Sequence, residues 1–517
     1  MRFRLYRVFL LAGIAVYGTA AHPCASCHPK EVAGYQKTGM GRSLQRVARQ
    51  PGGRFAHALS GSEFQIGSGP EGMVHTLERE GAIGKFNVDY VIGSGNHAFG
   101  YLVNVGGYLF QSPISYYSQR RLWDMAPGYE TDRSPDFTRP VTAECLWCHS
   151  GKPLPVKKTL NKYEQPAFAE EAISCDRCHG APGEHLKRPS VKNIVNPTRL
   201  SVRARDSVCE QCHLSGEVRI ANPGKEIGDF QPGQVLEDVF STYVFATASE
   251  SGLKVISHVQ QLARSSCQQK SGERLSCTTC HDPHDKPTNT ASYYRTKCLG
   301  CHTGIEKTHA KPVDDCVGCH MPSRQAKDGG HTAFTDHRIQ RKPVPATRES
   351  VASAKLVAWH EPATGLSVRN LALANLTVGE RDRSAFHMDE ASRLLVEARR
   401  SYPDDPAVLT GLGLLALRRR ETAEALPLFE KALQADPGYA PYQVNLATAL
   451  KAAGRIEEAI ALLKKAIASD PSLEVAYRRL GEIMRERGRP NELRAVFESY
   501  LKFMPNNVTA RIALQSQ

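Results

Sequence analysis

Residues 277–302 read CTTCHDPHDKPTNTASYYRTKCLGCH and contain the pattern Cys-x-x-Cys-His twice. The same pattern occurs seven times in the 517 residues and uses all but one of the 15 cysteines. The cysteine pairs are Cys24/Cys27, Cys145/Cys148, Cys175/Cys178, Cys209/Cys212, Cys277/Cys280, Cys298/Cys301 and Cys316/Cys319. The histidines that follow them are His28, His149, His179, His213, His281, His302 and His320. We number these motifs 1 to 7 in chain order. Such repetition indicates one kind of site, built seven times.

The spacing within each motif suits a covalently bound haem. Two thiols three residues apart can each react with one vinyl group on the same porphyrin edge, and the next imidazole can then bind the iron. Zinc sites use facing Cys-x-x-Cys pairs without a histidine directly after them, and a disulfide framework gives no reason for seven adjacent histidines. The sequence therefore predicts seven c-type haems. Cys267 stands outside the motifs; a buried structural thiol is the prediction, with a haem ligand or a redox thiol as alternatives.

Each iron also needs a second axial ligand, and low-potential electron-transfer haems commonly have two histidines. A Gly/Pro turn follows motif 3 and would return His185 toward a neighbouring haem. His22 and His57 are reserve candidates, whereas His75, His360 and His387 are expected to be structural. The predicted second ligands are His97, His185, His258, His284, His309, His331 and His337.

The N-terminus has the composition of a secretory signal peptide. Basic residues precede an apolar run from Val8 to about Tyr17, which ends in small residues near Ala21. The run is too short to span a bilayer comfortably, so residues 1–21 are predicted to be removed and the mature chain to be periplasmic or otherwise exported, without a membrane span. The formal charge of +13 is assigned to neutralising haem propionates, and nucleic acid is not expected as a partner.

The motifs divide the chain into regions. Residues 22–345 are predicted to form a heptahaem domain, mostly α and irregular around haems packed edge to edge, with a β-rich insertion at about 50–140. Residues 214–250 are read as rich in strands and turns. A linker at 346–371 is expected to pass into a helix near Val351 to Trp359.

A 34-residue period follows. Pro403, Pro437, Pro471 and Pro505 share this spacing, and small residues recur where paired helices would cross. This pattern is typical of tetratricopeptide repeats, so four repeats are predicted at 372–507, with a tail at 508–517. Such α-solenoids usually bind a protein segment, and redox partner proteins are therefore expected.

Several stretches resemble bacterial multihaem cytochromes of the hydroxylamine oxidoreductase and ammonia-oxidiser tetrahaem cytochrome superfamily, in the group with C-terminal tetratricopeptide repeats. These stretches are Tyr90-Val-Ile-Gly-Ser-Gly95, Trp123-Asp-Met-Ala-Pro-Gly128, Cys280-His-Asp-Pro-His284, Cys319-His-Met-Pro322 and Asp336-His-Arg-Ile339. The resemblance implies a mostly α fold around stacked haems, with His185, His284 and His309 as distal ligands. Related pentahaem nitrite reductases have lysine in place of the motif histidine at the catalytic haem, a feature missing here.

These observations favour an electron-transfer protein with a repeat domain that docks partners. The alternative is an oxidoreductase that converts a small nitrogen or sulfur compound at one open haem. Motif 1 is the candidate for that open site, because its second ligand is the hardest to name. No catalytic residue is assigned, and an electron carrier is favoured over an enzyme.

Overall fold

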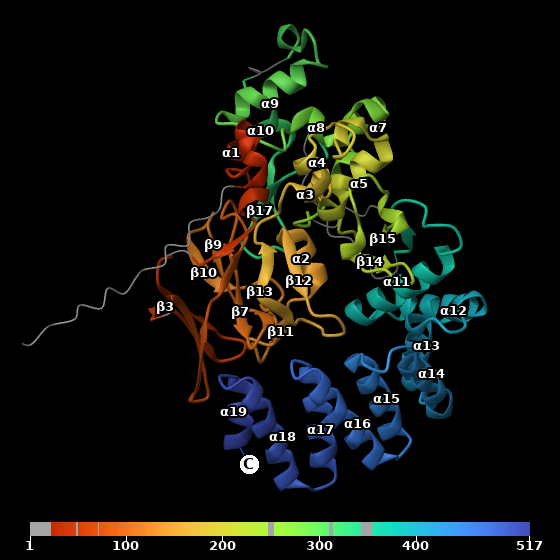
Figure 1. Cartoon of the computed structure of the whole chain (residues 1–517). Helices are drawn as coiled ribbons and strands as arrows, with labels where there is room; N and C mark the ends of the chain where they lie inside the picture. Colours follow the sequence, from red (N-terminus) through yellow and green to blue (C-terminus); the bar gives the residue numbers. More distant parts are fainter. Residues whose placement is uncertain are drawn as a thin grey trace, which may run out of the picture.

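The computed structural model describes residues 22–47, 50–70, 72–246, 253–309, 314–342 and 354–516. The predicted signal peptide lies outside these residues. Within the described ranges, no helix is both long enough and apolar enough to cross a membrane. Figure 1 shows three layers: short helices that carry most of the motifs at the top, β-sheets in the middle and a curved row of helix pairs at the bottom.

The N-terminal third is built from strands. A four-stranded antiparallel sheet has the order β2-β3-β4-β5, a five-stranded sheet has the order β1-β6-β7-β8-β11, and β9 pairs with β10. Their bounds are β1 Leu44–Arg46, β2 Gly53–His57, β3 Ser62–Gly69, β4 Gly72–Arg79, β5 Ala82–Asn87, β6 Tyr90–Ile92, β7 Gly100–Val105, β8 Tyr108–Gln111, β9 Ile114–Tyr117, β10 Leu122–Met125 and β11 Arg139–Pro140. The predicted β-rich insertion is therefore confirmed, whereas a mostly α region from residue 22 onward is not.

Strand β4 shows why this region is a sheet. Its buried side chains alternate, from Met73 through His75 to Leu77, as expected for a strand with one face on the core. Together with Phe64 and Phe110 these strands supply their own hydrophobic core. The strands therefore do not depend on porphyrin to fill the space between them.

His75 is fully buried in this core, as expected for a structural histidine, and its Nδ1 lies 2.9 Å from Ser112 Oγ. Burial lowers the pKa of His75 to about 3, so the imidazole is neutral in the folded protein. In the unfolded chain its pKa is about 6.5, and below that pH the unfolded state binds a proton that the folded state does not. Stability is therefore lost as pH falls from about 6.5 toward 3.

We expect this single group to lower the free energy of unfolding by about 1.4 kcal/mol per pH unit in that window. Substitution His75→Phe should remove this slope, while lowering stability at pH 7 through loss of the Ser112 contact. Urea unfolding followed by circular dichroism at pH 7, 6, 5 and 4 measures both effects. A variant with the parental slope would contradict the assignment.

The motif-bearing region consists of short helices joined by loops. Its helices are α1 Pro29–Tyr35, α2 Ala143–His149, α3 Asp176–His179, α4 Gly183–Lys187, α5 Val202–His213, α6 His258–Ala263, α7 Ser266–Ser271, α8 Cys277–Cys280, α9 Thr290–Leu299 and α10 Cys316–His320. Two-stranded sheets join β12 Lys152–Pro155 to β13 Tyr163–Glu170 and β16 Ser323–Gln325 to β17 Ala333–Thr335. Apolar clusters are sparse here, as expected of a region whose interior is completed by a large group.

A three-stranded sheet connects this region to the repeats. Strand β15, Phe240–Phe245, lies between β14, Val218–Ala221, and β18, Leu356–Ala358. The strands at 218–245 agree with the predicted strand- and turn-rich segment. The helix expected near Val351 to Trp359 is wrong where the structure describes it, because residues 356–358 pair with the exposed edge of β15.

The C-terminal part is a row of antiparallel helix pairs. The helices are α11 Ser367–Asp382, α12 Ala385–Ser401, α13 Pro406–Arg418, α14 Thr422–Ala435, α15 Ala440–Ala452, α16 Ile456–Ser469, α17 Glu474–Glu486, α18 Pro490–Phe503 and α19 Val508–Gln515. At Gly413 a Cβ would lie only 2.7 Å from the Phe429 ring, so α13 and α14 cross closely because position 413 is glycine. Most residues of the predicted tail form α19.

Hydrogen bonds join the repeats to the rest of the chain near their start, in their middle and at their end. In α11, Asn370 Nδ2 donates to Ser241 Oγ of β15 at 3.1 Å. In the middle, Asp470 accepts a hydrogen bond from the Leu160 amide at 3.0 Å. At the end, the Thr509 amide donates to Asp136 at 2.9 Å. Figure 1 shows α19 beside the N-terminal strands, and one hydrophobic core includes residues of both.

Candidate haem-binding sites

Each motif lies on or at the end of a short helical segment. Motif 1 begins in the 3₁₀ helix Pro23–Ser26, and motif 6 begins in the last turn of α9. The other five motifs lie on a helix or at one of its ends: motif 2 at α2, motif 3 at α3, motif 4 at α5, motif 5 at α8 and motif 7 at α10. Residues three apart share one face of a helix, so both thiols of a motif point to the same side. Caps define where these turns start: Ser201 Oγ accepts from the Ala204 amide, and Asp315 Oδ1 accepts from the Gly318 amide.

Not every attachment thiol lies inside the polypeptide. Haems packed edge to edge in a common core would place the thiols in the interior, but four of them are exposed: Cys27, Cys145, Cys301 and Cys319. Cys27 lies at the C-terminal end of the short 3₁₀ helix of motif 1, and Cys301 follows α9. Neither of these two helices has a buried residue. The polypeptide by itself therefore leaves these two thiols open, because the short helices that carry them bury too little surface to cover their own cysteines. Cys27 and Cys301 stay predicted attachment residues, at the rim of the haem-binding region.

Five motif histidines face a second histidine. A metal-bound imidazole nitrogen lies about 2 Å from the ion and the ring centre about 1 Å further, so two imidazoles on opposite sides of one iron have ring centres about 6 Å apart. The observed centre-to-centre distances are 6.5 Å for His28 and His185, 5.8 Å for His179 and His284, 5.7 Å for His213 and His258, 6.2 Å for His281 and His337, and 6.1 Å for His320 and His309. These separations leave room for an iron between the rings.

The hydrogen bonds of these rings also suit metal binding. Nδ1 of His179 lies 2.8 Å from the Val195 carbonyl oxygen, and Nδ1 of His320 lies 2.9 Å from that of Gln340. Three more histidines have an oxygen within hydrogen-bond distance of Nδ1: His185 (Ser190 O, 3.0 Å), His281 (Tyr294 Oη, 3.0 Å) and His337 (Thr335 O, 2.9 Å). In the described part of the chain, Nε2 of these five rings forms no hydrogen bond. Metal-binding histidines have this arrangement, because an acceptor on Nδ1 fixes the tautomer that presents Nε2.

Three of the paired histidines form a cluster with His213. His258 lies 4.8 Å from His337 and 5.7 Å from His213 between ring centres, and His337 lies 6.2 Å from His281. Burial lowers the pKa of His258 to about 3 and that of His281 to about 4, so both rings are neutral at pH 7. Only the neutral imidazole can bind a metal, so the folded chain holds these rings in the competent state.

The remaining candidates are placed differently. His331 Nε2 lies 2.7 Å from Asp124 Oδ2, so its Nε2 is already engaged, and its ring contacts Tyr117. The His97 ring packs on Phe334 at 4.2 Å, and its Nδ1 lies 2.9 Å from Gln119 Nε2. Among the described residues, no second histidine ring contacts His149 of motif 2 or His302 of motif 6.

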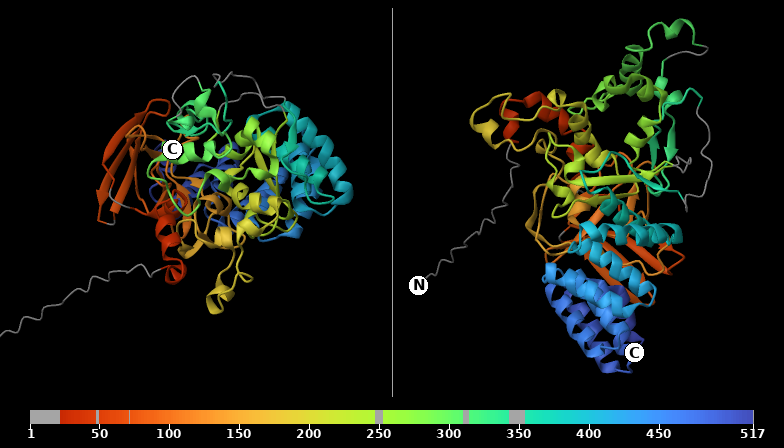
Figure 2. Two further views of the ribbon diagram at one scale, coloured as in Figure 1. Left: turned by 90° about the horizontal axis from the view of Figure 1, so that it is seen from above. Right: turned by 90° about the vertical axis from the view of Figure 1, so that its right-hand side faces the viewer.

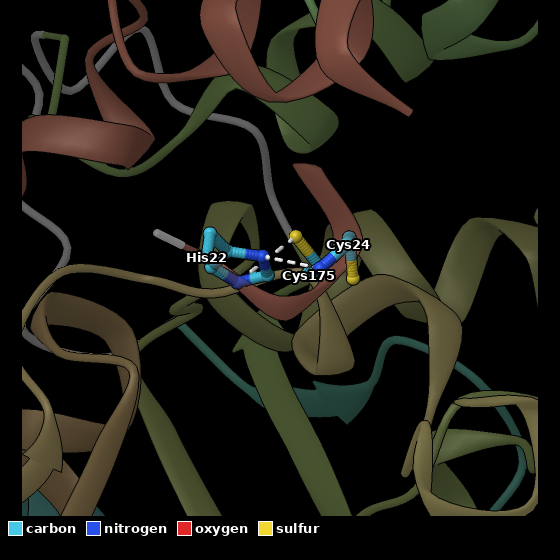
Figure 3. A group of neighbouring side chains, drawn as sticks. All are labelled: His22, Cys24 and Cys175. Carbon is cyan, nitrogen blue, oxygen red and sulfur yellow. Dashed lines mark hydrogen bonds between the residues drawn. The ribbon is translucent and has the colours of Figure 1, made fainter. Parts of the chain in front are cut away.

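Motif 1 is not isolated in space. Figure 3 shows His22, Cys24 and Cys175 together, and their ligand atoms lie within 4.8 Å of one another. Cys24 belongs to motif 1 and Cys175 to motif 3. As thioethers of two haems these sulfurs would be poor ligands for a separate metal ion, so we interpret the cluster as two adjacent attachment sites.

Other thiols of different motifs are also neighbours. The interaction of Cys148 with Cys212 lowers the pKa of Cys148 to about 6 and raises that of Cys212. The interaction of Cys209 with Cys277 raises the pKa of Cys209. Cys298 of motif 6 likewise contacts Cys316 of motif 7. A thioether sulfur has no titrating proton, so these pKa shifts would disappear if haem were attached. The closeness of the motifs would remain.

Sequence reasoning missed the acceptors that orient the histidines. Val195, Gln340, Ser190 and Thr335 act through backbone oxygens, which leave no signature in side-chain identity. Tyr294 was equally inconspicuous, although it lies 13 residues from His281 along the chain.

The comparisons with known proteins agree with both parts of the chain. Two family models described as tetratricopeptide repeat match residues 387–440 and 416–480. The high-molecular-weight cytochrome c of Nitratidesulfovibrio vulgaris is 30% identical over 190 residues, 36% of this chain and 32% of that protein. The dissimilatory sulfite reductase MccA of Wolinella succinogenes is 26% identical over 223 residues, 35% of this chain and 27% of that protein.

The chain thus spans about a third or less of the length of the curated relatives that it matches. Among solved structures, a mutant of MamA is 26% identical over 28% of this chain and 81% of its own, with a TM-score of 0.23. The protein therefore has distant similarity to multihaem c-type cytochromes, which suggests haem c and electron transfer, and it has tetratricopeptide repeats, which imply protein interaction.

Proposed function

We propose that this protein is an exported c-type cytochrome that holds seven haems and transfers electrons along them. The observation that carries the proposal is the set of five histidine pairs, with rings about 6 Å apart and, in most of them, an oxygen acceptor on Nδ1. When bound, haem supplies a reversible one-electron couple. The chain supplies the thiols that attach it and the imidazoles that hold the iron low-spin.

The contacts between motifs support transfer of electrons from haem to haem rather than storage of electrons at separate haems. Cys24 lies beside Cys175, and Cys209 lies beside Cys277, so porphyrin edges attached there would be close neighbours. His337, after motif 7, faces His281 of motif 5, and His284, after motif 5, faces His179 of motif 3. Each such pair connects segments that belong to different motifs. Electron tunnelling weakens steeply with distance, so this interleaving favours rapid transfer.

The repeats would dock a protein partner near motif 2. A pocket of about 620 Å³ lies between the loop after β14 and the turn between α12 and α13, lined by residues that include Lys225, Tyr402 and Asp404. Arg219 also lines it, and its Nη1 lies 3.7 Å from Cys148 Sγ. A partner segment bound in this pocket would lie close to a haem-attachment site.

A second function is favoured by a specific observation. His149 and His302 have no histidine ring opposite them in the described part of the chain, so one of these irons could keep an open position. One relative is named a dissimilatory sulfite reductase. An oxidoreductase acting on a small sulfur or nitrogen compound at motif 2 or motif 6 is therefore the alternative, in place of motif 1, whose His28 faces His185.

The purified holoprotein decides between these functions. We expect the pyridine haemochrome spectrum to give seven haems per chain. If the EPR spectrum of the fully oxidised protein shows only low-spin signals, every iron is six-coordinate and the electron-transfer function stands alone. A high-spin signal of about one haem would support the oxidoreductase, and a chain purified without covalent haem would contradict both proposals.

A further inference from the structure

The middle residues of three motifs are connected through Arg177. Trp147 precedes Cys148 in motif 2, Arg177 precedes Cys178 in motif 3 and Gln211 precedes Cys212 in motif 4. The Arg177 guanidinium carbon lies 3.3 Å from the centre of the Trp147 ring, which is a close cation–π contact. Gln211 Nε2 donates to the Arg177 carbonyl oxygen at 3.0 Å.

A third contact closes this arrangement. Cys148 Sγ of motif 2 lies 3.6 Å from the Gln211 carbonyl oxygen of motif 4. Motif 2 therefore contacts both motif 3 and motif 4, and motif 4 contacts motif 3. The variable positions of a Cys-x-x-Cys-His motif have no part in haem attachment, so these three residue types were free to be selected for contact with one another.

Arg177 places a positive charge at the centre of this arrangement. The residue is 8% exposed, and its guanidinium donates to the carbonyl oxygens of Gly151 at 2.9 Å and Ser150 at 3.5 Å. Among the described residues, no carboxylate forms an ion pair with it. The neighbouring Asp176 carboxylate instead accepts from the Ser174 hydroxyl. The charge of Arg177 is therefore only partly compensated within the protein.

We propose that Trp147, Arg177 and Gln211 join motifs 2, 3 and 4 into a three-way junction, and that the buried charge of Arg177 raises the reduction potentials of the three haems attached there. This inference rests on the proposed haem binding. One-electron transfer between two motifs oxidises one iron(II) to iron(III) and reduces another iron(III) to iron(II), so no further reactant is needed. A nearby positive charge favours the less positive, reduced state. Electrons entering elsewhere would thus collect at the junction.

The test compares three arginine variants of the holoprotein in a spectroelectrochemical titration. Arg177→Gln removes the charge, Arg177→Lys keeps it, and Arg188→Gln removes a charge whose side chain is 85% exposed. We expect all variants to bind seven haems. In Arg177→Gln three of the seven potentials should fall, each equivalent to about a tenfold shift of the reduction equilibrium, the order expected for one partly buried unit charge.

Arg177→Lys should restore most of this shift, and Arg188→Gln should leave all seven potentials in place. The junction is refuted if Arg177→Gln binds seven haems and its potentials move no further than those of Arg188→Gln. Loss of covalent haem from the unaltered chain would instead refute the proposed function, so the two failures are distinguishable.

A second measurement does not depend on folding of the arginine variants. The double substitution Cys145→Ala, Cys148→Ala removes the attachment site of motif 2 but keeps Trp147, Arg177 and Gln211. We expect six haems, with altered EPR lines for two of them because their magnetic neighbour is gone. An EPR spectrum equal to the parental one minus a single independent haem would overturn the junction.

Discussion

Substitution His284→Ala is expected to convert one of the seven haems from low-spin to high-spin. The His284 ring faces His179 of motif 3 across 5.8 Å, and alanine cannot bind iron from that side. The haem should remain attached, because Cys175 and Cys178 are unchanged. EPR of the oxidised protein should show a high-spin signal of about one haem, while the pyridine haemochrome spectrum still gives seven.

His331→Ala is the matched control. The two histidine side chains are similarly exposed, 41% for His284 and 43% for His331, but His331 Nε2 is engaged by Asp124 at 2.7 Å. We expect His331→Ala to leave every haem low-spin. A high-spin signal in this variant would make His331 a ligand, as the sequence predicts, and an unchanged spectrum in His284→Ala would remove His284 from the ligand set.

Substitution Arg369→Ala is expected to cost about 3 to 5 kcal/mol of stability, the range for removing one partner of a buried ion pair. Arg369 Nε lies 2.8 Å from Asp405 Oδ2, and the two side chains are 5% and 7% exposed. The same guanidinium donates to the Ala221 carbonyl oxygen of β14 at 2.9 Å. Its loss therefore leaves the Asp405 carboxylate without its cation, although Oδ1 of Asp405 still accepts from the amides of Ala407 and Val408, and it leaves the Ala221 carbonyl oxygen without this donor. Urea unfolding followed by circular dichroism measures the loss.

Arg393→Ala is the control for this prediction. Arg393 lies on α12 and pairs with Glu390 at 3.0 Å, but its side chain is 60% exposed. Surface ion pairs of this kind contribute about 0 to 1 kcal/mol. Equal destabilisation by Arg369→Ala and Arg393→Ala would show that burial of the Arg369 pair does not determine its strength.

The repeats are well predicted from the sequence because contacts between neighbouring helices determine their structure. A proline every 34 residues and small residues at helix crossings depend only on neighbouring helices, so a single chain reveals them. The strands at 53–140 are likewise predictable from alternation and glycine pairs. Strand β18 is not, because residues 356–358 become a strand only through pairing with β15, more than 100 residues earlier in the chain.

The predicted haem sites differ in the same way in how far the sequence reveals them. The Cys-x-x-Cys-His motif is a local pattern, whereas the partner of each histidine depends on how distant loops meet. Motif 1 looks isolated along the chain, yet Cys24 lies beside Cys175 and His28 faces His185. His331 has a favourable sequence position but turns to Asp124, a residue that no sequence pattern connects with it.

The surroundings of the motifs are equally non-local. Whether a thiol such as Cys27 or Cys301 is exposed or enclosed depends on which distant segments cover its helix, and the motif itself carries no such information. The contacts of Trp147, Arg177 and Gln211 likewise leave no trace in motif spacing.

The attachment of the repeat row at its two ends and its middle has a mechanical consequence. An unattached solenoid is flexible, because each repeat contacts only the next one and small rotations add up along its length. Here hydrogen bonds of Asn370, Asp470 and Thr509 attach the row to the rest of the chain at successive points. Its bending and twisting are suppressed, so the row acts as a stiff brace across the lower face of the molecule (Figure 2). A partner bound to the repeats would therefore lie at a nearly constant distance from the motif-bearing region, and not on a flexible tether.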